Sequence, residues 1–167
     1  PAVQTPAVSG KNPSGSISKR PAQSSAEDTA VAQRPVHAFG ELILLAPVSG
    51  VLYPLERVPD PVFSQKLAGD GISIDPTDNI LRAPCPGEIV QQHAAGHAVT
   101  LKAAGDVEVL MHVGIDTVTL KGKGFTSRVK VGDKVETGAP LIEFDLDYVG
   151  TNAKSLLTEV IISNGER

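Results

Sequence analysis

Two histidines, His97 and His112, have the strongest potential for chemistry in this sequence. Imidazole is the only side chain that titrates near neutral pH without help from its surroundings. His112 lies inside residues 107–120, the longest β-favouring run of the chain, so a rigid strand is expected to hold it. Paired imidazoles serve as metal ligands, as a general acid and base, or as a nucleophile with an electrostatic helper.

The segments that carry the two histidines flank Ala104-Gly105, which can close a tight hairpin. In that register His97 lies directly opposite His112 on one face of the sheet. If the turn moves on by one residue, Val99 faces His112 and His97 becomes a diagonal neighbour at about 7–8 Å. Both registers predict that the two imidazoles lie together.

A metal site would need further ligands. His93 is a candidate, but the Ala-Ala-Gly between it and His97 does not favour a helix, and the sequence has no His-Glu-x-x-His motif or cysteine pair. The phosphate-binding Gly-x-x-x-x-Gly-Lys-Ser/Thr motif and the hydrolase Gly-x-Ser-x-Gly motif are also missing. The remaining interpretation is a histidine nucleophile whose neighbour stabilises the charge of the group it receives.

Composition limits the class of protein. With 167 residues, 41% of them hydrophobic, the chain can bury one ordinary core, and four Phe, two Tyr and no Trp predict an aliphatic one. A net charge of −4 argues against a nucleic-acid surface. The single cysteine, Cys85, predicts a reducing compartment and stands between two prolines with nothing nearby to activate it.

The first forty residues differ from the rest. Residues 1–40 are rich in Pro, Ala and Ser without periodicity, which predicts a flexible tether. Residues 41–167 are expected to form the globular domain. From Gly40 onward 11 basic and 17 acidic residues give −6. Because the sequence has no long apolar run and no signal peptide, a cytoplasmic location without membrane insertion is expected.

In the globular part, turn motifs separate short apolar segments, as in a β protein. Ala46-Pro-Val-Ser-Gly50 and Ala83-Pro-Cys-Pro-Gly87 lie 37 positions apart, each between short apolar segments, and indicate a duplicated strand–turn–strand motif. Residues 129–144 form a further strand-and-turn unit. Together with the many glycines and prolines, these patterns predict an all-β sandwich or barrel.

Two very short helices are expected as well. One begins at Asp60 as N-cap, with Pro61 in the first helical position, and stops at Gly69. The other spans residues 146–154.

The motifs also match a known family. They are His97-Ala98, His112-Val-Gly-Ile-Asp-Thr-Val118, Leu120-Lys-Gly-Lys-Gly-Phe125, Glu143-Phe-Asp145 and Val160-Ile-Ile-Ser-Asn164, with Ala46-Pro-Val-Ser-Gly50, Val58-Pro-Asp-Pro-Val-Phe63 and Gly69-Asp-Gly-Ile72 before them. Over about residues 41–164, the chain resembles the glucose-type enzyme IIA domains of the bacterial phosphoenolpyruvate:sugar phosphotransferase system.

The resemblance implies an antiparallel β-sandwich and a cytoplasmic phosphocarrier in sugar uptake, which is a histidine phosphotransferase component. His112 would be the phosphorylated residue, and His97 would stabilise the transferred group. The phosphoryl donor would be the histidine-containing phosphocarrier protein and the acceptor an enzyme IIB module. A transient phosphohistidine then needs no metal or nucleotide, although zinc at His97 and His112 stays open.

The resemblance also implies a partner surface. Its residues are two carboxylates that would meet arginine and an apolar ring around the active histidine: Asp60 and Asp116, with Val62, Phe63, Leu67, Leu110 and Val118. The acidic balance of the domain suits fast, transient docking of a basic partner.

The sequence also differs from the family pattern and allows other functions. Ala95 stands where many relatives have a threonine that hydrogen-bonds the supporting histidine. The residues of the motifs are most similar to those of enzyme IIA domains in multidomain phosphoryl-transfer proteins. The tether would equally suit a domain that follows a membrane permease in one chain. The rival functions are a regulatory protein-binding module and a zinc-binding structural domain that uses His93, His97 and His112.

Overall fold

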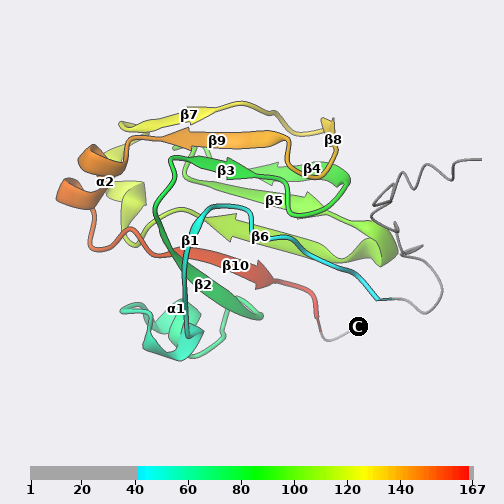
Figure 1. Cartoon of the computed structure of the whole chain (residues 1–167), viewed down its shortest axis with the longest axis horizontal. Helices are drawn as coiled ribbons and strands as arrows, with labels where there is room; N and C mark the ends of the chain where they lie inside the picture. Colours follow the sequence, from blue (N-terminus) through cyan, green and yellow to red (C-terminus); the bar gives the residue numbers. More distant parts are fainter. Residues whose placement is uncertain (1–40, 166–167) are drawn as a thin grey trace, which may run out of the picture. The chain divides into compact units, whose positions relative to one another are not determined.

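The structure, a computed structural model, describes residues 41–165, so the predicted tether at residues 1–40 lies outside the described residues. Its strands form two antiparallel sheets (Figure 1). The larger sheet has the order β1 (Gly50–Tyr53), β2 (Asp70–Pro76), β10 (Thr158–Ile162), β6 (Glu108–His112), β5 (Ala98–Lys102), β4 (Gly87–Gln92) and β8 (Lys134–Val135). The smaller sheet has the order β3 (Ile80–Arg82), β9 (Pro140–Phe144) and β7 (Phe125–Ser127). The prediction of an all-β antiparallel sandwich is confirmed.

The main core lies between these sheets and is aliphatic, as the composition predicts. Met111 and Leu101 of the larger sheet pack in one cluster with Leu141 and Phe144 of the smaller sheet, and each is at most 2% exposed. Alternate residues of β6, Val109 and Met111, point into this core. His112 and Leu110 therefore lie on the opposite face of the larger sheet.

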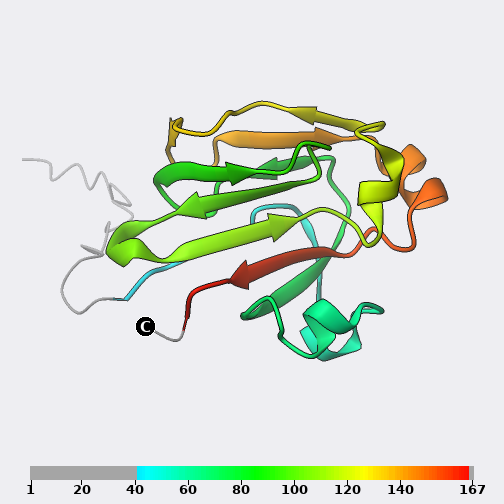
Figure 2. The ribbon, with the colours of Figure 1, turned by 180° about the vertical axis from the view of Figure 1, so that it is seen from behind.

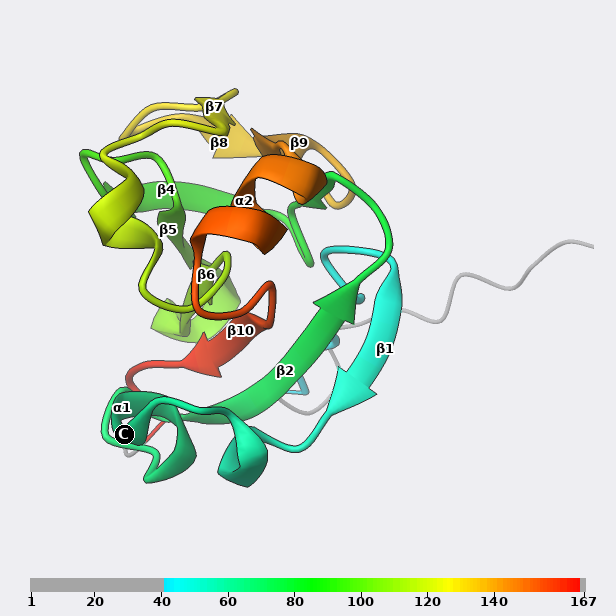
Figure 3. The same cartoon turned by 90° about the vertical axis from the view of Figure 1, so that its left-hand side faces the viewer.

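A second, smaller cluster covers part of that opposite face. Its buried members are Leu55, Val58, Phe63, Ile115 and Ile161. They come from β10, from the turn after β6 and from two short helical elements, η1 (Leu55–Arg57) and α1 (Pro61–Ser64), with Val58 directly after η1. Figures 1 and 3 show α1 beside the start of β2, away from α2 (Leu146–Asn152). The element α1 places Phe63 near His112 at the end of β6.

Both predicted helices are present, although each is shorter than expected. Asp60 caps α1, because its Oδ1 accepts a hydrogen bond of 2.8 Å from the backbone N–H of Val62. The second helix is capped in the same way by Asp145, which accepts from the backbone of Tyr148. No helix in residues 41–165 is long and apolar enough to cross a membrane.

The hairpin that joins β5 to β6 has neither of the two expected registers. Its loop is η2 (Ala104–Asp106), in which Gly105 and Asp106 have φ of 70° and 61°. The three-residue loop places Ala98, not His97 or Val99, opposite His112. Figure 2 shows β5 and β6 as antiparallel neighbours. His97 consequently lies one residue before β5.

The β-favouring run at residues 107–120 is not one strand. β6 ends at His112, and the chain turns through Gly114 and Asp116, with φ of 72° and 60°, into the 3-10 helix η3 (Thr117–Leu120). Left-handed backbone cannot continue a strand. The Thr117 hydroxyl donates to the backbone oxygen of Val113 at 2.9 Å and ties the turn together. His112 is thus a strand-end residue rather than an interior one.

The duplicated motif is present as two turns that contact each other. The Leu45 N–H donates to the Pro84 oxygen at 2.9 Å, and the Arg82 N–H donates to the Pro47 oxygen at 2.7 Å. The apolar segment before the first turn is not a strand in the structure, unlike its counterpart β3. Cys85 is buried in the second turn, where burial raises the pKa of its thiol, so the expectation of an unactivated cysteine holds.

Candidate functional site

His97 and His112 lie edge to face, with ring centroids 4.8 Å apart and an interplanar angle of 75°. The His97 residue is 2% exposed, whereas the His112 side chain is 20% exposed. A backbone hydrogen bond of 2.8 Å from Val113 N–H to the His97 oxygen joins the two segments. The prediction that the two imidazoles meet is confirmed, by a bend at Gly96 (φ 73°) rather than by facing strand positions.

His97 is held among other rings. His93 and Phe125 pack against it, with ring centroids 4.3 and 6.1 Å away. Burial, together with the neighbouring His112 and His93, lowers the pKa of His97 to about 4. Its Nδ1 has no hydrogen-bond partner among the described residues. At neutral pH His97 is therefore an uncharged imidazole. Such a ring has one N–H that can donate a hydrogen bond to an anionic group, and one unprotonated nitrogen.

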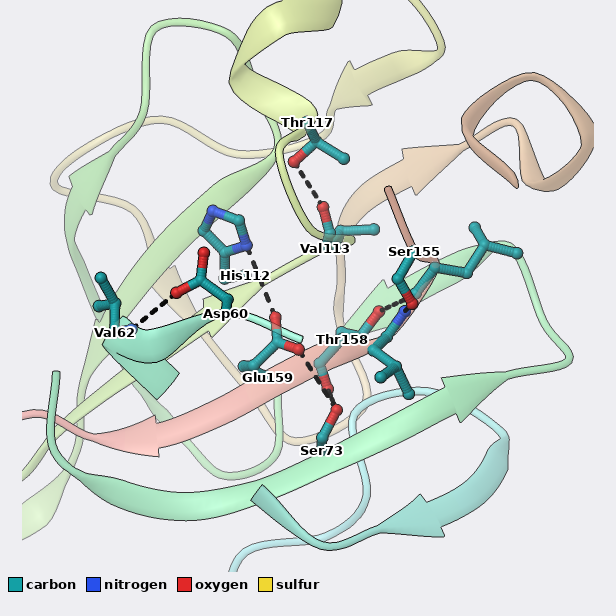
Figure 4. Close-up of polar contacts among 11 residues, drawn as sticks. Asp60, Val62, Ser73, His112, Val113, Thr117, Ser155, Thr158 and Glu159 are labelled. Atoms are coloured by element: carbon teal, nitrogen blue, oxygen red, sulfur yellow. Dashed lines mark hydrogen bonds and ion pairs between the residues drawn. The ribbon is translucent and has the colours of Figure 1, made fainter. Parts of the chain in front are cut away.

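Two polar side chains near His112, those of Glu159 and Ser73, were not predicted from the sequence. The Glu159 carboxylate, fully buried on β10, has its Oε2 3.6 Å from the His112 Nδ1, and Ser73 of β2 donates to its Oε1 at 3.3 Å (Figure 4). Burial raises the pKa of Glu159 to about 7, although the neighbouring His112 and the hydroxyl of Ser73 oppose this shift. The only signal in the sequence is a single carboxylate inside the apolar run at residues 156–162.

The exposed side of His112 opens into a cavity of about 330 Å³. The lining residues are Asp60, Val62, Phe63, Ala68, Leu110, His112, Asp116, Thr117 and Val118. The cavity therefore gathers six of the seven residues expected at the partner surface. Leu67 is 70% exposed and does not line it.

Of the apolar residues that line the cavity, two are exposed and one is buried. Val62 and Val118 are 45% and 53% exposed, so a docking surface can use them. Phe63 is 7% exposed and belongs to the second core cluster, and its ring lies 5.3 Å from that of His112. Phe63 thus packs near the imidazole of His112 as part of this core cluster.

Comparison with known proteins identifies the family. Residues 42–167 match the family model described as phosphoenolpyruvate-dependent sugar phosphotransferase system, EIIA 1. The chain belongs to this family. It is 48% identical over 124 residues to the glucose-specific EIIA component of Halalkalibacterium halodurans, which covers 74% of this chain and 72% of that protein. An N-acetylglucosamine-specific EIICBA component of Klebsiella pneumoniae is 43% identical over 74% of this chain and 19% of its own length.

A solved structure agrees with the fold of this enzyme IIA domain. The glucose permease IIA from Mycoplasma capricolum superposes with a TM-score of 0.72 at 35% identity, over 75% of this chain and 83% of that one. The expected family, fold class and general function are confirmed. The chain is a phosphotransferase component of the sugar phosphotransferase system, a carrier of phosphoryl groups in sugar uptake.

The rival readings gain no support from the comparisons. Within residues 41–165, no group of three or more His, Cys, Asp or Glu side chains is arranged to hold a metal ion, although His93, His97 and His112 are neighbours. A structural zinc site normally has four protein ligands in a tetrahedron. His93, His97 and His112 supply three imidazoles, one fewer than such a site needs.

Proposed function

We propose that His112 is the residue of this enzyme IIA domain that accepts the phosphoryl group and that His97 stabilises the group during transfer. The observation that carries the proposal is the contrast between the two rings. His112 is partly exposed on the cavity, and His97 is buried behind it as a neutral imidazole.

The transfer is a displacement between two imidazoles. The unprotonated Nε2 of His112 attacks phosphorus, an Nε2–P bond forms, and the donor's N–P bond breaks with its electron pair returning to the donor ring. Because one N–P bond replaces another, the group can move on with little change in free energy. An N–H of His97 donates to the equatorial phosphoryl oxygens, where transition-state charge accumulates. We propose that no resident metal or nucleotide takes part.

The partners follow from the surface. We infer that phosphorylated histidine-containing phosphocarrier protein docks over the cavity and that an enzyme IIB module later uses the same face. Asp60 and Asp116 line the cavity and would pair with arginine, while Val62 and Val118 would make apolar contacts. Both partners act in the cytoplasm, where we place the domain. The EIICBA relative has the same type of domain in one chain with other components, which supports a close functional link.

The test is phosphoryl transfer from phosphoenolpyruvate through enzyme I and the phosphocarrier protein, measured by intact mass and acid lability. The native chain should gain one acid-labile phosphoryl group, and His112→Ala should gain none. His97→Gln should accept the group but pass it on at least about 100-fold more slowly, because a positioned hydrogen-bond donor to the transition state is lost.

His93→Gln is the matched control, since His93 packs against His97 but lies outside the cavity. It should retain both steps. An unlabelled native chain in the presence of competent partners would refute the relay.

A further inference from the structure

Three polar side chains lie in one row across the larger sheet. In the strand register, Glu159 of β10 pairs with Ser73 of β2 on one side and with His112 of β6 on the other. Directly paired residues of antiparallel strands project to the same face. The row therefore runs from a buried hydroxyl through a buried carboxyl to the ring of His112 (Figure 4).

The two facing atoms have no other partner. Within the part of the chain that the structure describes, neither the Nδ1 of His112 nor the Oε2 of Glu159 makes a hydrogen bond, and the two lie 3.6 Å apart. Both atoms are buried, and buried polar groups without partners are rare because each costs free energy. Catalytic hydrogen bonds are often long in the free protein and shorten when the partner or substrate binds.

We propose that Glu159 is a positioning residue for phosphoryl transfer: its carboxylate accepts the Nδ1–H of His112 and so keeps Nε2 unprotonated and directed at the cavity. This inference rests on the proposed role of His112 as the acceptor. A neutral imidazole has one N–H, and the hydrogen bond at one nitrogen decides which nitrogen carries the lone pair. Ser73 fixes the carboxylate from the other side.

The same contact also assists the charge change. When Nε2 forms its bond to phosphorus, the ring of His112 keeps the proton on Nδ1 and becomes cationic until the group leaves. A carboxylate behind the ring stabilises this cation, as an acidic residue does in other catalytic sites that use histidine. No proton has to leave the site during either step.

Two isosteric variants separate the roles of acceptor and charge. Glu159→Gln keeps an amide oxygen that can accept the Nδ1–H but carries no charge, and Glu159→Met keeps the volume and has no acceptor. Glu88→Met, at an exposed strand position, is the matched control. Each is studied at a pH above the Glu159 pKa of about 7, where the carboxyl is ionised, by ¹⁵N NMR of His112 in the unphosphorylated protein and by single-turnover transfer from the phosphorylated phosphocarrier.

The Nδ1–H form should dominate in the native protein and in Glu159→Gln, while Glu159→Met should shift toward the Nε2–H form. Transfer to Glu159→Met should be about 10-fold to 100-fold slower, the range for groups that orient a histidine from behind. The transfer rate should fall less in Glu159→Gln and should be unchanged in Glu88→Met.

An unchanged tautomer and rate in Glu159→Met, with the native chain labelled normally, would overturn the positioning role. If the native chain accepts no label, the proposed function fails instead, and the NMR result then decides the tautomer question alone.

Discussion

At the scale of single residues, the site depends on how burial shifts the pKa values of an imidazole and a carboxyl. Burial disfavours the charged form of both, so it lowers the pKa of His97 to about 4 and raises that of Glu159 to about 7. Between them lies His112, which is partly open to solvent. The imidazole of His112 thus has an uncharged ring on one side and a titratable carboxyl on the other.

These two shifts predict opposite effects of pH on stability. From pH 4.5 to about 7 the folded protein keeps a proton on Glu159 that the unfolded chain has lost, so this residue makes the free energy of unfolding fall as pH rises. From pH 4 to 6.5 the unfolded chain binds a proton at His97 that the folded protein does not, so this residue makes the free energy of unfolding rise.

Denaturant unfolding of the native chain and two variants between pH 4.5 and 6.5 separates these effects. Relative to the native chain, Glu159→Gln should have a stability that rises more steeply with pH, and His97→Gln one that rises less or falls. Parallel curves for all three proteins would contradict the assigned protonation states.

At the scale of elements, the turn after β6 decides where His112 points. Gly114 has a φ of 72°, and a Cβ there would lie 2.6 Å from the Thr117 Cγ2 and 3.0 Å from the Ser155 oxygen. Sequence analysis predicted that a strand continues past His112, since valine, isoleucine and threonine favour strands. The prediction was wrong because Gly114 and Asp116 adopt left-handed backbone, which local propensity does not reveal.

Gly114→Ala should therefore destabilise the domain by more than the left-handed penalty of about 1–2 kcal/mol. The matched control is Gly105→Ala in η2, where φ is 70° and a Cβ would meet nothing within 4 Å. Chemical denaturation of both variants measures the difference, which is the cost of the steric contact at Gly114. Equal losses would show that the turn adapts to the methyl group.

At the scale of the whole molecule, the sequence predicts some levels of structure well and others not at all. Turn motifs and short apolar segments predicted an all-β sandwich or barrel, and the resemblance to enzyme IIA domains implied that it is an antiparallel sandwich. The positions of the two histidines around one hairpin predicted that their rings lie together. The contact of Glu159 with His112 was not predictable, because it depends on the pairing of β10 with β6 across 47 positions of sequence. The hairpin register failed for a local reason, the three-residue loop η2.

The charge of the molecule makes a separate prediction about docking. Because residues 40–167 carry a formal −6 and two aspartates line the cavity, association with a basic phosphocarrier should be steered electrostatically. Its rate should fall as salt rises and screens the charges. Asp60→Asn keeps a side-chain oxygen for the cap of α1 but removes the charge, so it should weaken the salt dependence without loss of stability. Stopped-flow association at several salt concentrations measures this, and an unchanged salt slope in Asp60→Asn would exclude Asp60 from the docking surface.

In the proposed relay one particular nitrogen, the Nε2 of His112, carries the phosphoryl group. The most direct measurement is combined ³¹P and ¹⁵N NMR of the uniformly ¹⁵N-labelled protein after transfer from the phosphocarrier. We expect one phosphorus resonance coupled to the Nε2 of His112, with the proton still on Nδ1. Phosphorus coupled to Nδ1, or to a nitrogen of His93 or His97, would contradict it.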